Sequence, residues 1–115
     1  MVVVRVNKHT GEKECILVER RDEPAQGKWW FPGGRHIKGE TFFSAAERKC
    51  KSETGLRGTA TQVLGVWNTF FPTSAWDIKN ASGEMAGTQT VNVAVYIEVA
   101  DGSEVLLNKT SDRFR

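Results

Sequence analysis

The sequence has little of several features that would identify its class at once. It has 2 cysteines and 3 prolines in 115 residues, no long run of one charge, and no apolar stretch that could cross a membrane. Its 16 basic and 14 acidic side chains leave a formal net charge of +2, so composition gives no electrostatic case for nucleic acid or an anionic membrane as partner. The length fits one core, and we interpret residues 1–115 as a single domain.

The few cysteines and the N-terminal segment indicate the compartment. Cys15 and Cys50 lie in apolar segments without metal-ligand spacing, so we expect free, buried thiols rather than a disulfide. Residues 1–6 lack the layout of a signal peptide. We therefore expect a cytoplasmic location.

Apolar, β-branched runs separated by polar turns predict strands. The turn at residues 7–11 is of the hairpin type, and residues 72–87 form a long polar loop. The strands expected from this pattern are Val2–Val6, Glu14–Arg20, Lys28–Phe31, Gln62–Phe70, Thr90–Val99 and a short Glu104–Leu107.

One segment, Thr41–Thr54, predicts a helix. Thr41 is a suitable N-cap, and Gly55 supplies the left-handed stop at the other end. Ser44 with Glu47 offers a rival capping box one turn later.

Strands on both sides of a helix predict an α/β (α+β) fold, in which a mixed β-sheet is sandwiched by helices. A second helix is not evident before the sequence ends at Arg115. Two alternatives follow: the sequence is truncated at its C-terminus, or one face of the sheet is covered in another way.

The segment around the helix contains the residues that suggest chemistry. Pro32-Gly33-Gly34 predicts a tight turn, where backbone approaches a ligand without interference from a Cβ atom. Positions 49, 52 and 53 share one helix face and hold Lys49, Ser52 and Glu53.

Glu53 is thus the single carboxylate of this face. It can hold a divalent cation if carbonyl groups, waters and substrate phosphates complete the coordination shell. The alternative is an exposed ion pair with Lys49 at i, i+4. For Glu40 and Arg48 the alternatives are a solvated charge pair, or a pair that fixes the loop to the helix and adds positive charge.

The run Trp29–Leu56 resembles the box of the Nudix hydrolase family, G-x5-E-x7-R-E-U-x-E-E-x-G-U with U aliphatic. Glu40, Arg48, Glu53 and Gly55 match it. In a full box positions 49, 52 and 53 are all glutamates, and their carboxylates hold magnesium or manganese. Two of those three carboxylates are missing here.

Three segments resemble, more narrowly, the branch of this family that hydrolyses GDP-mannose and lacks the same two glutamates. They are Pro24–Gly27, Pro32–Arg35 and Gly65–Trp67. The resemblance implies a homodimer and Mg²⁺ (or Mn²⁺) bound by the Gly33 carbonyl and Glu53. It also implies arginines near the substrate diphosphate, at Arg20, Arg35 and Arg48.

The general base of that branch has no counterpart here. Its histidine and the preceding metal-binding glutamine are absent from Asn108–Arg113, and Thr69 stands where the branch has another histidine. Of the two histidines, His9 lies in the hairpin turn and His36 is interpreted as a surface loop residue. Carboxylates expected in loops are left as alternative bases: Asp77, Glu84 and Asp112.

Most of the aromatic side chains lie on expected strands, which favours packing in the core. They are Trp29, Trp30, Trp67, Phe70 and Phe71. Trp76 lies in the long loop and is therefore the candidate for contact with a nucleobase.

The sequence therefore predicts a Mg²⁺-dependent hydrolase of a nucleotide sugar such as GDP-mannose, with Arg48, Glu53 and Glu40 as catalytic residues. Arg20, Arg35 and Trp76 are expected to bind the substrate, a small molecule. Two alternatives remain: a pyrophosphohydrolase of nucleoside triphosphates or ADP-ribose, and a degenerate module that binds nucleotides without turnover.

Overall fold

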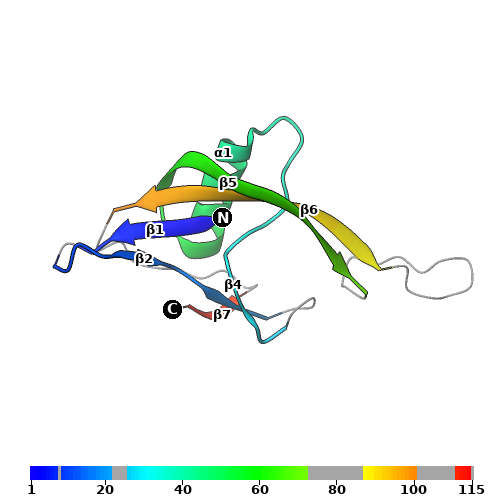
Figure 1. Ribbon diagram of the computed structural model, residues 1–115, viewed down its shortest axis with the longest axis horizontal. Helices are drawn as coiled ribbons and strands as arrows, with labels where there is room; N and C mark the ends of the chain where they lie inside the picture. The colour runs from blue at the N-terminus through cyan, green and yellow to red at the C-terminus, as the bar shows by residue number, and fades with distance from the viewer. Residues whose placement is uncertain (8, 22–25, 73–86, 101–110, 115) are drawn as a thin grey trace, which may run out of the picture.

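The computed structural model describes residues 1–7, 9–21, 26–72, 87–100 and 111–114. In this part of the chain, two β-sheets accompany one α-helix (Figure 1), which confirms the expected mixed α+β fold. The elements are β1 (Val2–Val6), β2 (Lys13–Cys15), β3 (Val18–Arg20), β4 (Trp29–Trp30), α1 (Phe42–Thr54), β5 (Gly58–Phe71), β6 (Thr88–Val99) and β7 (Ser111–Phe114).

The larger sheet has four strands in the order β2-β1-β6-β5. β1 runs parallel to β6, with Val3 opposite Ile97, and the other neighbours are antiparallel. The turn between β1 and β2 is the expected hairpin. The side-chain oxygen of Asn7 accepts hydrogen bonds from the backbone nitrogens of His9 and Thr10, at 2.9 and 3.2 Å, which fixes the turn.

The smaller sheet has three strands in the order β4-β3-β7. We expected one strand over Glu14–Arg20, but Ile16 and Leu17 separate β2 from β3, and the two strands belong to different sheets. Asp112 was expected to lie in a loop, and this was wrong, because it belongs to β7, which pairs with β3. The expected strand Glu104–Leu107 lies outside the described residues.

The helix begins and ends where the sequence predicts. The Thr41 hydroxyl accepts a hydrogen bond from the Ser44 backbone nitrogen at 3.0 Å, and the Thr41 nitrogen donates to the Ser44 hydroxyl at 2.9 Å. This capping box makes Ser44 the third helical residue, so the rival box of Ser44 with Glu47 is wrong. Gly55 ends the helix with φ 73°, a conformation that favours glycine.

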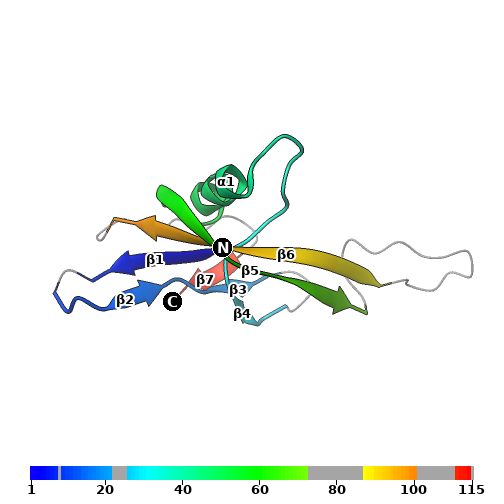
Figure 2. The same ribbon diagram turned by 45° about the horizontal axis from the view of Figure 1, so that its top comes forward.

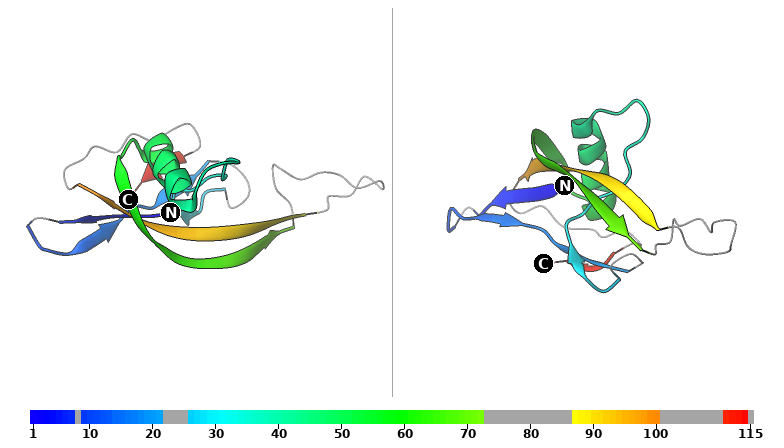
Figure 3. Two further views of the ribbon diagram at one scale, coloured as in Figure 1. Left: turned by 90° about the horizontal axis from the view of Figure 1, so that it is seen from above. Right: turned by 45° about the vertical axis from the view of Figure 1, so that its right-hand side comes forward.

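The core lies between α1 and the larger sheet. Figure 3 shows the helix lying across one side of β5 and β6. Ala46 and Cys50 of the helix pack against apolar residues of the strands and of the segments next to them, which are Val3, Ile16, Leu56, Ala60, Val95, Ile97 and Val99. Cys50 is buried and free as expected. Cys15, also free, is exposed, so the expectation of two buried thiols was wrong for this residue on the edge strand β2.

β5 and β6 form a long hairpin whose distal part extends beyond the helix (Figure 2). Val66 pairs with Val93 and Asn68 with Val91, so side-chain alternation sets Val66, Phe70 and Val91 on one face. These three side chains are 61%, 63% and 72% exposed. The described segments contain no helix long and apolar enough to span a membrane.

Candidate active site

Arg48 on α1 holds the preceding loop through Glu40. The arginine Nε donates to one carboxylate oxygen at 2.7 Å, and its second nitrogen donates to the other at 2.9 Å. The same guanidinium donates to the Arg35 carbonyl at 2.9 Å, and Glu40 accepts from the backbone nitrogen of Ile37 at 2.9 Å. This bidentate pair fixes the loop to the helix, which is the structural function expected of it.

The same contacts keep both groups charged. The hydrogen bond from Arg48 is the main cause that lowers the pKa of Glu40 below its ordinary value. The hydrogen bond to Glu40 raises the pKa of Arg48 in return. Because these charges compensate one another, the geometry supports Arg48 and Glu40 as residues that position the loop. Their catalytic role stays a prediction.

The helix face at positions 49, 52 and 53 carries an ion pair. The Lys49 ammonium lies 2.7 Å from a carboxylate oxygen of Glu53. The Glu53 side chain is 8% exposed and that of Lys49 is 19% exposed, whereas Ser52 is exposed. The i, i+4 pair that the sequence offered as an alternative is therefore present, but Glu53 is buried and Lys49 half-buried rather than exposed.

The Gly33-Gly34 turn lies against this ion pair. Pro32 before it is buried, and an ideal Cβ atom on Gly34 would come within 1.9 Å of the Lys49 Cε atom. The Lys49 side chain thus crosses the backbone of Gly34, in space that any other residue would fill. Gly33 has more room, since a Cβ atom placed on it would have the Phe31 carbonyl oxygen, at 3.9 Å, as its nearest neighbour.

As the side chains lie in this structure, the helix face does not present an open site for a divalent cation. In the parts of the chain that the structure describes, no three His, Cys, Asp or Glu side chains come together as metal ligands. The one carboxylate of the helix face already binds an ammonium group. Glu53 and the Gly33 carbonyl therefore stay predicted metal ligands, and that prediction requires the Lys49 ammonium to move.

The other expected binding residues lie on separate elements. Arg35 is exposed in the loop that Arg48 holds, so these two residues lie together. Arg20 lies on β3 in the smaller sheet, where its backbone bonds to those of Gly27 and Lys28. Trp76 lies outside the described residues.

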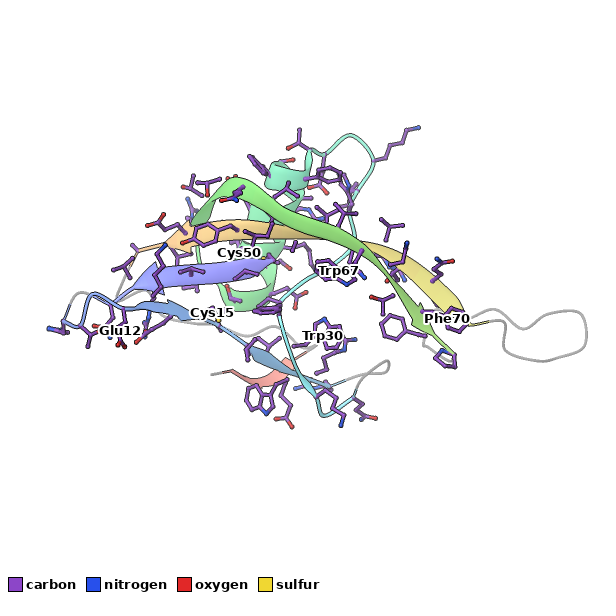
Figure 4. All side chains as sticks on the ribbon, in the orientation of Figure 1. Glu12, Cys15, Trp30, Cys50, Trp67 and Phe70 are labelled. Carbon is purple, nitrogen blue, oxygen red and sulfur yellow. The ribbon has the colours of Figure 1, made fainter. Side chains whose placement is uncertain are left out.

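Several aromatic side chains are exposed rather than packed in the core. Trp30 on β4 is 44% exposed and Trp67 on β5 is 52% exposed (Figure 4), as is Phe70 at 63%. The expectation of core packing was wrong for these three, because the distal hairpin and β4 lie away from the helix. Trp29 and Phe71 are half-buried.

The candidates for a general base lie in different parts of the chain. His36 is exposed, in contact with the Glu40 carbonyl and with the ring of Phe42, as expected of a surface loop residue. Asp112 lies on β7 and not in a loop, so that interpretation was wrong. Asp77 and Glu84 lie outside the described residues.

One positioning residue was not found from the sequence. A Glu47 carboxylate oxygen accepts a hydrogen bond from the Ala60 backbone nitrogen at 2.9 Å, which joins α1 to β5. The position of Glu47 within the box segment indicated that it could have a role, but the sequence pattern does not identify Ala60 as its partner.

Comparison with known proteins agrees with this fold. The low-salt glycan biosynthesis protein Agl8 of Haloferax volcanii is 40% identical over 63 residues, which are 55% of this chain and 40% of that protein. The ADP-ribose pyrophosphatase of Methanocaldococcus jannaschii is 34% identical over 58 residues, 50% of this chain and 34% of that protein. These alignments cover less than half of either relative.

Solved structures share the fold at lower identity. The binary complex of a C. elegans Ap4A hydrolase superposes with a TM-score of 0.68 at 19% identity, over 99% of this chain and 73% of that chain. The family model described as the NUDIX domain matches residues 1–113. The box residues Gly34, Glu40, Arg48 and Glu53 lie on one loop and the helix that follows it. The chain therefore belongs to the Nudix family.

Proposed function

We propose that this Nudix chain hydrolyses a nucleoside diphosphate derivative, and that the substrate is a nucleotide sugar such as GDP-mannose. The observation that carries the proposal is the Lys49–Glu53 ion pair at the place where a full box has metal-binding carboxylates. Attack at phosphorus commonly relies on metal ions clamped by several protein carboxylates. Attack of water at the sugar anomeric carbon needs positive charge on the leaving diphosphate instead.

The chain's own cations supply that charge. Arg35 lies in the loop that Arg48 of α1 holds through the Arg35 carbonyl, and we assign its exposed side chain to the diphosphate. Arg20 is the further arginine that the proposal assigns to the diphosphate. Mg²⁺ or Mn²⁺ enters as part of the substrate, on its diphosphate oxygens, since magnesium usually keeps several waters and binds substrate phosphates.

A small-molecule nucleotide also needs a surface for its base. Trp76 remains our proposed contact. The exposed rings of Trp30 and Trp67 are further flat apolar surfaces on which a base can stack.

Hydrolysis in oxygen-18 water tests the proposal directly. With GDP-mannose and Mg²⁺, we expect the label in the released mannose, because water attacks carbon. Label in the phosphate would refute this reaction. Arg35→Ala is expected to weaken substrate binding about 10- to 100-fold through loss of a charge-assisted hydrogen bond. Lys38→Ala, which removes an exposed cation from the same loop, is the matched control.

Two alternatives have support of their own. A relative named as an ADP-ribose pyrophosphatase supports cleavage between phosphates, which would label phosphate in the same assay. The occupied Glu53 carboxylate supports a module that binds nucleotides without turnover. Binding without hydrolysis across nucleotide sugars, ADP-ribose and nucleoside triphosphates would establish that module.

We propose further that the chain forms a homodimer in the cytoplasm. The exposed apolar side chains of Val66, Phe70 and Val91 on one face of the hairpin support an interface, since exposed apolar patches commonly mark one. The free thiols of Cys15 and Cys50 agree with a reducing compartment. Light scattering on a size-exclusion column tests the dimer, and Val91→Lys is expected to convert it to a monomer.

A further inference from the structure

The Glu53 carboxylate is already neutralised by a group of the chain itself. Its partner, the Lys49 ammonium, lies at 2.7 Å, and only 8% of the Glu53 side chain is exposed. Water therefore has little access to this carboxylate, and an opposite charge at this distance replaces much of the lost hydration. A second cation would meet the repulsion of the first.

The path of the Lys49 side chain is fixed by a separate feature. A Cβ atom on Gly34 would lie 1.9 Å from the Lys49 Cε and 2.7 Å from its Nζ. The lysine therefore passes directly over the glycine backbone to reach Glu53. The absence of a Cβ atom at Gly34 leaves the space through which the lysine passes.

We propose that Lys49 is a built-in cation, which occupies the place of a divalent metal at Glu53 and excludes metal from that carboxylate. The lysine neutralises Glu53 and ties α1 to the Gly33-Gly34 turn. Mg²⁺ also sheds its water reluctantly, so it does not compete well with a positioned ammonium group. This inference concerns the free chain and holds whether or not a substrate is hydrolysed.

Manganese binding, followed by the electron paramagnetic resonance signal of free Mn²⁺, tests the proposal without substrate. Glu53→Gln is expected to leave the Mn²⁺ affinity of the wild-type chain unchanged. Lys49→Glu is expected to bind Mn²⁺ at least about tenfold more tightly than wild type, because two carboxylates then face one site. Adding Glu53→Gln to that variant should remove the gain.

The matched control is Lys51→Glu, which makes the same change of charge at an exposed position of the same helix. It is expected to bind Mn²⁺ as the wild-type chain does. If Glu53→Gln weakens Mn²⁺ binding of the wild-type chain about tenfold or more, the metal already uses Glu53 and the proposal is wrong. An equal gain in the Lys49 and Lys51 variants would also overturn it.

A second pair of variants leaves every charge in place. Gly34→Ala forces the Lys49 side chain to move, whereas Gly33→Ala meets only ordinary contacts. We expect Gly34→Ala to gain Mn²⁺ binding that depends on Glu53, and Gly33→Ala to behave as wild type. Identical Mn²⁺ binding by these two variants would overturn the claim that the path over Gly34 holds the pair. Circular dichroism confirms folding of each variant, and the glycine pair carries the test if Lys49→Glu does not fold.

Discussion

Replacing Lys49 by methionine is expected to destabilise the fold by about 2–3 kcal/mol. Exposed ion pairs contribute about 0.2–1 kcal/mol, whereas removing one partner of a buried pair costs about 3–5 kcal/mol. The Glu53 side chain is 8% exposed, but that of Lys49 is 19% exposed, so the expected cost lies between these ranges. Methionine keeps much of the apolar side chain over Gly34, and the loss therefore reports mainly on the charge.

Urea unfolding in the presence of EDTA, followed by tryptophan fluorescence, measures this free energy. The double variant Lys49→Met with Glu53→Gln is expected to lose less than Lys49→Met alone, because the Glu53 carboxylate whose charge Lys49 offsets is then replaced by a neutral amide. Lys51→Met, an exposed lysine of the same helix, should change stability by less than about 0.5 kcal/mol. If the stability change of Lys49→Met is also smaller than about 0.5 kcal/mol, the Lys49–Glu53 pair is solvated and the reasoning is refuted.

Three further predictions concern the frame around the site. Arg48 lowers the pKa of Glu40, so the stability that this ion pair gives the fold is complete above the ordinary glutamate pKa of about 4.3 and is lost as pH falls through the lowered pKa. The melting-temperature difference between wild type and Glu40→Gln should therefore shrink in acid, and a difference that stays constant with pH would contradict this. A thiol reagent should label the exposed Cys15 in the folded chain but Cys50 only after denaturation, because burial excludes the reagent and raises the pKa of the Cys50 thiol. Equal labelling rates of the two thiols in the folded chain would contradict this prediction. Thr41→Ala should cost about 1 kcal/mol of unfolding free energy in urea through loss of the N-cap, and no loss would show that the cap is dispensable.

The helix and its caps could be predicted because their signals are local. Thr41, Ser44 and Gly55 satisfy the ends of one segment, and their effect does not depend on distant strands. The hairpin at Asn7 is predictable for the same reason. Only the choice of capping box needed the structure, since Ser44 is compatible with both boxes.

The pairing of distant strands could not be read from the sequence. β7 forms by backbone hydrogen bonds to β3, and the sequence Ser111–Phe114 alone does not indicate which strand it pairs with. The break at Ile16 and Leu17 is hidden in the same way, because the apolar pattern continues while the chain changes sheets. Exposure of Trp67 follows from the length of the hairpin beyond the helix, which is also a tertiary property.

In the site, spacing predicted which residues meet but not how deeply they are buried. The Glu40–Arg48 pair and the Lys49–Glu53 pair both follow from helix periodicity and the box. Burial of Glu53 and the passage of Lys49 over Gly34 depend on how the loop folds back. Those two facts are the basis of our proposal that Lys49 takes the place of a metal at Glu53 in the free chain.

Crystals grown with Mn²⁺ and measured near the manganese absorption edge test the central claim most directly. For the wild-type chain we predict electron density for the Lys49 ammonium beside Glu53 and no anomalous peak at that carboxylate. For Lys49→Glu we predict an anomalous peak there. A manganese ion coordinated by Glu53 in the wild-type crystal, with Lys49 turned away, would contradict the account.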